Sequence, residues 1–90
     1  MGTDSSGGTP RVRLTVYSRT HCHLCEEMIA GLQELQARFA FEVGVVDVDA
    51  DPALAVRYGE LIPLLAHGER ELCRYRLEPA RLTAYLDGFR

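Results

Sequence analysis

The sequence predicts an α/β fold with a mixed four-stranded sheet and helices on both faces. Stretches rich in β-branched and aromatic residues alternate with stretches whose apolar residues recur at helical spacing. The last two apolar stretches are joined by a short reversal that contains Gly68, which indicates a hairpin. The expected element order is therefore βαβαββα. We expect strands one to three to be parallel, joined by right-handed crossovers, and the last strand to be antiparallel at an edge.

The first strand is expected over Arg11–Tyr17, where apolar and polar residues alternate, and a turn over Ser18–His21. A helix over Cys22–Arg38 follows, with its apolar side chains at helical spacing. Cys22 stands at the expected cap of this helix, and Thr20 is a second candidate. Gly31 costs about 1 kcal/mol relative to Ala inside a helix. It either permits close packing or is simply tolerated.

The second strand is expected over Phe41–Val48, which is so rich in valine that both of its faces should be covered. Asp47 marks its carboxyl end near solvent, and the alternative is that this carboxylate assists proton transfer at the second cysteine. The helix Pro52–Tyr58 should begin with Asp51 as its cap and proline in its first turn. Gly59 should stop it in a left-handed conformation.

The step Ile62–Pro63 opens the third strand, Leu64–Ala66, and suits the first residue of a strand or a cis bond in a tight turn. The final strand is expected over Glu71–Leu77, with Cys73 as a buried core residue. The last helix should begin at Pro79. Three arginines in this region form either an anion-binding patch or a solvated surface: Arg74, Arg76 and Arg81.

Two cysteines, Cys22 and Cys25, stand at the start of the first helix. Unsatisfied N–H groups and the helix dipole stabilise a thiolate there, so its pKa falls from about 8.5 to roughly 3.5–7.5. Cys22 is then the nucleophile, and Cys25, on the same helical face, the resolving thiol. The alternative is a zinc site, which needs four ligands. The other candidate ligands are His21, His23, His67 and Cys73.

Length and composition limit the function classes. Ninety residues make a single domain over residues 11–90, preceded by a Gly/Ser/Thr-rich leader, Met1–Pro10, that we expect to be disordered. The chain has no apolar run long enough for a membrane helix and no visible secretory signal, so we expect a cytoplasmic protein. The net charge of −3 disfavours nucleic-acid and acidic-membrane partners, and the absence of lysine excludes lysine-based catalysis.

The segment Tyr17–Glu27, the element order and the Ile-Pro step together resemble the thioredoxin fold. Within that fold they are similar to the glutaredoxin branch, and most of all to the small bacterial glutaredoxin-like proteins. The resemblance covers about Val12 to Phe89. It implies that Cys22 is the exposed nucleophile and Cys25 the resolving thiol.

The resemblance also implies how substrate binds. Pro63 maps onto the family's cis-proline, Ile62 would offer its backbone to a substrate strand, and Arg19 would meet a glutathione carboxylate. The residues between the cysteines tune the redox potential, and a protonated His21 or His23 would stabilise the Cys22 thiolate. The expected substrate-binding residues are thus Arg19, His21, His23, Leu24, Ile62 and Pro63.

The function predicted from these features is that of a thiol–disulfide oxidoreductase acting on a protein or small-molecule disulfide. We expect no bound cofactor, no metal and a monomeric protein, with glutathione as a candidate co-substrate. Two alternatives remain open: a carrier of metal or an iron–sulfur cluster, and a thioredoxin-fold interaction module without redox turnover.

Overall fold

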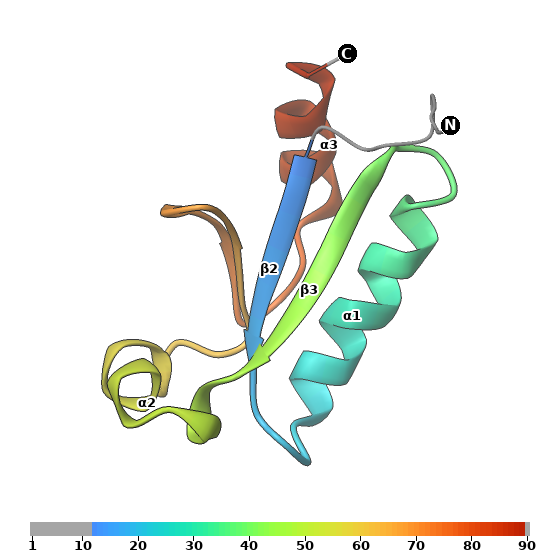
Figure 1. Cartoon of the computed structure of the whole chain (residues 1–90). Coiled ribbons are helices and arrows are strands. Elements are labelled where there is room, and N and C mark those ends of the chain that lie inside the picture. The colour runs from blue at the N-terminus through green and yellow to red at the C-terminus, as the bar shows by residue number, and fades with distance from the viewer. Residues whose placement is uncertain (1–11, 90) are drawn as a thin grey trace, which may run out of the picture.

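The computed structural model describes residues 12–89, so the predicted leader over residues 1–10 lies outside the described residues. The elements follow the expected order (Figure 1). They are β2 (Val12–Ser18), α1 (His23–Leu35), β3 (Phe41–Asp47), the 3-10 turn η1 (Val48–Ala50), α2 (Pro52–Tyr58), β4 (Leu64–His67), β5 (Arg70–Arg74) and α3 (Pro79–Asp87). Within this described part, no helix is long and apolar enough to cross a bilayer.

The four strands form a mixed sheet in the order β3-β2-β4-β5. Strands β2 and β3 are parallel, whereas β4 runs antiparallel to β2, so the prediction that strands one to three are parallel is wrong. The seven residues of α2 span only about 10 Å, against about 23 Å for the seven-residue strand β3. The chain therefore re-enters the sheet from the end where β3 leaves it, beside α2 (Figure 1).

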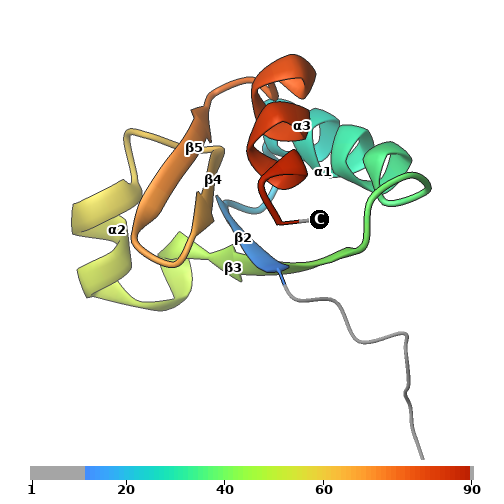
Figure 2. The ribbon, with the colours of Figure 1, turned by 90° about the horizontal axis from the view of Figure 1, so that it is seen from above.

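The helices cover both faces of the sheet, as predicted. Helices α1 and α3 lie together on one side, and α2 lies on the other (Figure 2). The inward side chains of β2 pack against α1 and α3 in one core. On the opposite face, Tyr17 of β2 stacks on Tyr58 of α2, with ring centroids 4.0 Å apart. The core residues are Val12, Leu14, Val16, Met28, Leu32, Leu35, Phe41, Leu65, Leu72, Cys73, Leu82 and Leu86.

Strand β3 lies at an edge of the sheet and ends at Asp47. The expectation that both of its faces are covered is wrong, because Val45 is 54% exposed. The Asp47 carboxylate accepts a hydrogen bond from the Asp49 N–H at 2.9 Å and so caps η1, in agreement with a strand end near solvent.

Helix α2 has its predicted bounds, and the Asp51 carboxylate accepts a hydrogen bond from the Ala53 N–H at 2.9 Å. The predicted left-handed stop at Gly59 is wrong, because its φ is −56°. A Cβ atom at Gly59 would clash with the carbonyl oxygen of Ala55, so close backbone approach accounts for glycine at this position.

The last strand ends at Arg74, three residues earlier than predicted, because Tyr75 adopts a left-handed φ of 71°. A β-bulge in the pairing of β4 with β5 places both Leu72 and Cys73 in the interior. Cys73 is 1% exposed, which confirms the prediction of a core cysteine. Burial raises the pKa of the Cys73 thiol.

Candidate active site

Cys22 is the N-cap of α1 and has an extended backbone, with φ −107° and ψ 107°. Its Sγ accepts a hydrogen bond from the backbone N–H of Cys25 at 3.1 Å. The cap is therefore Cys22 and not Thr20. The first turn of a helix has N–H groups without carbonyl partners, and here one of them points at the Cys22 sulfur. The same geometry stabilises negative charge on that sulfur.

The two sulfur atoms of Cys22 and Cys25 meet as a disulfide, with their Cα atoms 5.2 Å apart. The two residues differ in exposure: Cys25 is 1% exposed, whereas Cys22 is partly exposed. An incoming molecule therefore meets Cys22 first.

The cis-proline lies beside the cysteine turn. Leu64 of β4 pairs with Tyr17 of β2 in an antiparallel register. Pro63, one residue earlier, therefore lies opposite Ser18, where β2 ends and the turn begins. The Ile62–Pro63 peptide bond is cis, as the resemblance implied. The Pro63 carbonyl accepts a hydrogen bond from the Tyr75 N–H at 2.7 Å. The backbone of Ile62 has no hydrogen-bond partner within residues 12–89, so it is free to pair with an added strand.

Arg19 lies in the turn ahead of the cysteines but already has a partner. Its Nε and Nη2 donate to the two carboxylate oxygens of Asp49, at 2.8 and 3.2 Å. The hydrogen bond and the charge of Asp49 raise the pKa of the Arg19 guanidinium. The pair ties the turn to η1, and both side chains stay about half exposed. An anionic substrate at Arg19 would have to compete with Asp49.

The two histidines of the motif differ in their surroundings. His21 is exposed and adopts a left-handed φ of 59° in the turn. The His23 side chain is 82% exposed, and its Nε2 lies 2.8 Å from a carboxylate oxygen of Glu27 one turn along α1. A protonated His23 would therefore share its charge with Glu27 instead of acting on the Cys22 sulfur alone.

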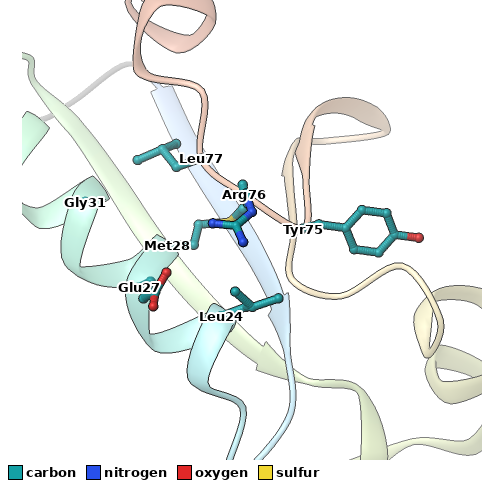
Figure 3. Close-up of a pocket in the computed structure, with 7 residues that line it drawn as sticks. All are labelled: Leu24, Glu27, Met28, Gly31, Tyr75, Arg76 and Leu77. Carbon is teal, nitrogen blue, oxygen red and sulfur yellow. The ribbon is translucent and has the colours of Figure 1, made fainter.

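A groove of about 230 Å³ opens beside the cysteines, and Leu24, which lies between them, forms part of its wall. One side of the groove is α1 and the other is the segment that follows β5 (Figure 3). Its lining residues are Leu24, Glu27, Met28, Gly31, Tyr75, Arg76 and Leu77. Figure 3 shows Arg76 directed toward α1, whereas the Tyr75 ring points away from it.

No signal in the sequence predicted this groove. Arg74, Arg76 and Arg81 were expected to form either an anion-binding patch or a solvated surface, and in the structure they have different surroundings. Arg74 pairs with Glu71 at 2.8 Å and Arg81 lies 3.9 Å from Glu78, whereas Arg76 lines the groove. The only sequence signal for a close approach here was Gly31, and a Cβ atom there would lie 2.7 Å from Leu77 Cδ2.

A metal site gains no support from the side chains that the structure describes. Over residues 12–89, no three His, Cys, Asp or Glu side chains form a group that could hold a metal ion. Cys73, the third cysteine, lies in the core.

The chain is similar to known proteins over most of its length. A model of the glutaredoxin-like domain (DUF836) matches residues 13–87. The solution structure of protein Ne2328 from Nitrosomonas europaea is 41% identical, with a TM-score of 0.76, and the match covers 92% of this chain and 99% of that one. Protein XcR50 from X. campestris is 34% identical, with a TM-score of 0.68 and coverage of 83% and 96%.

The thioredoxin of Fasciola hepatica is similar in fold, with a TM-score of 0.57 at 16% identity and coverage of 92% and 85%. No curated protein gives a significant match. These likenesses, together with the mixed sheet and its three helices, show a thioredoxin-like fold.

Proposed function

Because the chain belongs to the family of glutaredoxin-like domains (DUF836), we propose that it is a thiol–disulfide oxidoreductase whose reactive dithiol is Cys22 and Cys25. The observation that carries the proposal is the hydrogen bond from the Cys25 N–H to the Cys22 Sγ at the start of α1. It lowers the energy of the thiolate, which is the nucleophile in disulfide exchange.

The proposed reaction has two exchange steps. The Cys22 thiolate attacks one sulfur of a substrate disulfide, so that a mixed disulfide forms and the other substrate sulfur leaves as a thiolate. The Cys25 thiol then loses its proton to solvent and attacks the Cys22 sulfur. This releases the second substrate thiolate and leaves the Cys22–Cys25 disulfide. Two electrons pass to the substrate, and an external thiol reductant restores the dithiol.

The burial of Cys25 supports this order of events. Its side chain is 1% exposed, so it cannot reach a bulky disulfide directly, but its sulfur meets that of Cys22. Substrate would lie against the free backbone of Ile62, beside Pro63, and against the exposed side chain of Leu24. Arg19, His21 and His23 surround the same turn and would contact or tune the bound disulfide.

We place this reaction in the cytoplasm, with a monomeric protein that needs no bound cofactor. Its substrates are disulfides of proteins or small molecules. Glutathione is a candidate reductant, for which Arg19 would have to exchange its partner Asp49 for a glutathione carboxylate.

Three serine or alanine variants test the proposal. Cys22→Ser should abolish reduction of a disulfide substrate, and Cys25→Ser should accumulate a mixed disulfide that mass spectrometry detects. Cys73→Ala is the matched control, because this cysteine lies in the core and should leave the activity unchanged. Full reductase activity in both Cys22→Ser and Cys25→Ser would refute the proposal.

The reduction potential of the pair gives an independent test. The protein is equilibrated in glutathione buffers, and its free thiols are counted. A cytosolic reductant should have a potential of about −200 to −270 mV, the range of glutaredoxins and thioredoxin. If no Cys22–Cys25 disulfide forms at any ratio of oxidised to reduced glutathione, the redox function is wrong, and an interaction module or a metal carrier becomes the better explanation.

A further inference from the structure

The groove beside Cys22 contains a positive charge, that of Arg76, for which residues 12–89 provide no partner. We propose that Arg76 selects disulfide-bonded polypeptides that carry an acidic side chain next to the reacting cysteine. This inference rests on the proposed oxidoreductase function and adds the class of substrate.

Arg76 differs from the other arginines that the structure describes. Within residues 12–89, every other arginine has a carboxylate or an aromatic ring as its partner. No such partner is found for Arg76 in the same range. An arginine guanidinium binds carboxylates well because its planar fork of N–H donors matches two oxygens. Arg76 therefore retains this capacity for a ligand.

The backbone fixes the direction of Arg76. Tyr75 has a left-handed φ of 71°, and the Arg76 N–H donates to the Arg74 carbonyl at 2.8 Å, which forms a tight turn centred on Tyr75. The Tyr75 N–H donates to the Pro63 carbonyl, and the Tyr75 hydroxyl donates to the Glu60 carbonyl at 3.1 Å. The turn is thus attached to the cis-proline segment, and Arg76 points from it toward α1 (Figure 3).

Arg76 is the only basic residue among those that line the groove. Leu24, Met28 and Leu77 are apolar. Glu27 is the one acidic residue in the lining, and it lies 2.8 Å from His23 on its own helix. A substrate carboxylate would find an available guanidinium over an apolar surface, whereas a substrate lysine or arginine would be repelled by Arg76.

The length of the groove favours a polypeptide over free glutathione. A second hollow of about 340 Å³ continues the groove past Gly31 and Leu77, and is lined further along by Glu34, Leu35, Arg38 and Pro79. From Leu24 to Leu35, helix α1 rises by about 16 Å. A fully extended tripeptide reaches only about 10 Å. A longer chain could occupy both hollows while its cysteine lies at Cys22.

The test compares two disulfide-linked peptides that differ only in the residues beside the cysteine, which are acidic in one and basic in the other. A neutral small disulfide, 2-hydroxyethyl disulfide, provides the reference rate. The wild-type protein should have a kcat/KM about threefold to tenfold higher for the acidic peptide, as expected for a partly exposed ion pair. The preference should shrink at 1 M salt, where the Debye length is about 3 Å.

Arg76→Glu should reverse the preference between the two peptides, with each rate expressed relative to that of the same variant with 2-hydroxyethyl disulfide, and Arg76→Lys should retain part of the preference. Arg57→Glu is the matched control, because it makes the same change of net charge on α2, on the opposite face of the sheet. It should keep the wild-type ratio. An equal rate for both peptides in the wild-type protein, or an unchanged ratio in Arg76→Glu, would overturn the inference.

Glutathione disulfide is tested as a further substrate. It shows whether the carboxylate that binds Arg76 belongs to free glutathione or to a polypeptide. If Arg76→Glu lowers the rate with glutathione disulfide and leaves the peptide ratio intact, Arg76 serves free glutathione and the polypeptide assignment is wrong. Failure of all these disulfides to react would refute the proposed function itself, and this inference with it. Normal turnover without charge preference would refute only the inference.

Discussion

Replacement of Gly31 by alanine tests the packing between α1 and the segment that follows β5. Gly31 lies inside α1, and a Cβ atom added there would lie 2.7 Å from the Cδ2 atom of Leu77. Carbon atoms in good contact are separated by about 3.5–4.0 Å. Leu77 would have to move by about 1 Å, and it is partly buried against the core.

Two opposite effects determine the change in stability. Alanine favours the helix by about 1 kcal/mol relative to glycine, whereas overpacking costs about 1–3 kcal/mol. We therefore expect Gly31→Ala to lower the free energy of unfolding by about 0–2 kcal/mol. In a Leu77→Ala background the obstructing methyl group is absent. The same substitution should then raise the free energy of unfolding by about 1 kcal/mol.

The assay is urea unfolding of the wild-type protein, both single variants and the double variant, followed by circular dichroism. The four free energies form a double-mutant cycle, and its coupling energy should be about 1–3 kcal/mol. In thermal unfolding, 1 kcal/mol corresponds to about 4–8 °C for a domain of this size. Equal stabilisation by Gly31→Ala in both backgrounds would show that Leu77 does not restrict this position and would refute the reasoning.

Three further predictions concern the core and the cysteine turn. The free energy of unfolding should fall as the pH rises above about 9, because burial raises the pKa of Cys73 in the folded protein and the thiol therefore ionises first in the unfolded chain. Asp49→Asn should lower the KM for glutathione disulfide about twofold to fivefold, since it releases Arg19 to a substrate carboxylate. Tyr85→Phe should lower the free energy of unfolding by about 1 kcal/mol, because it removes the 2.6 Å hydrogen bond to His67 Nδ1.

Each of these has a measurement that could contradict it. The alkaline loss of stability should diminish in Cys73→Ala, and a thiol reagent should reach Cys73 only in the unfolded protein. Asp51→Asn makes the same charge change as Asp49→Asn while keeping a good N-cap for α2, and it should leave the KM unchanged. An unaltered unfolding midpoint in Tyr85→Phe would show that its hydroxyl contributes nothing to stability.

Local signals in the sequence were enough to predict some elements accurately. The bounds Pro52–Tyr58 of α2 and the position of Cys22 at the start of α1 are confirmed. Caps and proline act through residues a few positions away, so the sequence contains the whole cause. The direction of β4 and the edge position of β3 depend on which strands pair across the sheet. The valine content of β3 could not reveal that pairing.

The site also combines features that have a local cause in the sequence with features that depend on the tertiary structure. The close approach of Cys22 and Cys25 and the cis bond before Pro63 agree with the sequence. The groove was not predicted, because it depends on the left-handed backbone of Tyr75. Glycine or asparagine usually marks such a conformation, and tyrosine gives no signal. Because the sequence predicted that Arg76 lies inside a strand, its position in the groove could not be predicted.

Burial of Cys25 also limits where oxidative damage can begin. A peroxide must reach a thiolate to oxidise it, and of the pair only Cys22 is exposed to solvent. A sulfenic acid formed on Cys22 would lie against the sulfur of Cys25, which can condense with it to a disulfide and release water. The irreversible sulfinic and sulfonic acids need further peroxide at the same atom. In the proposed redox function, the covered second cysteine would thus favour reversible over irreversible oxidation of the site by peroxide.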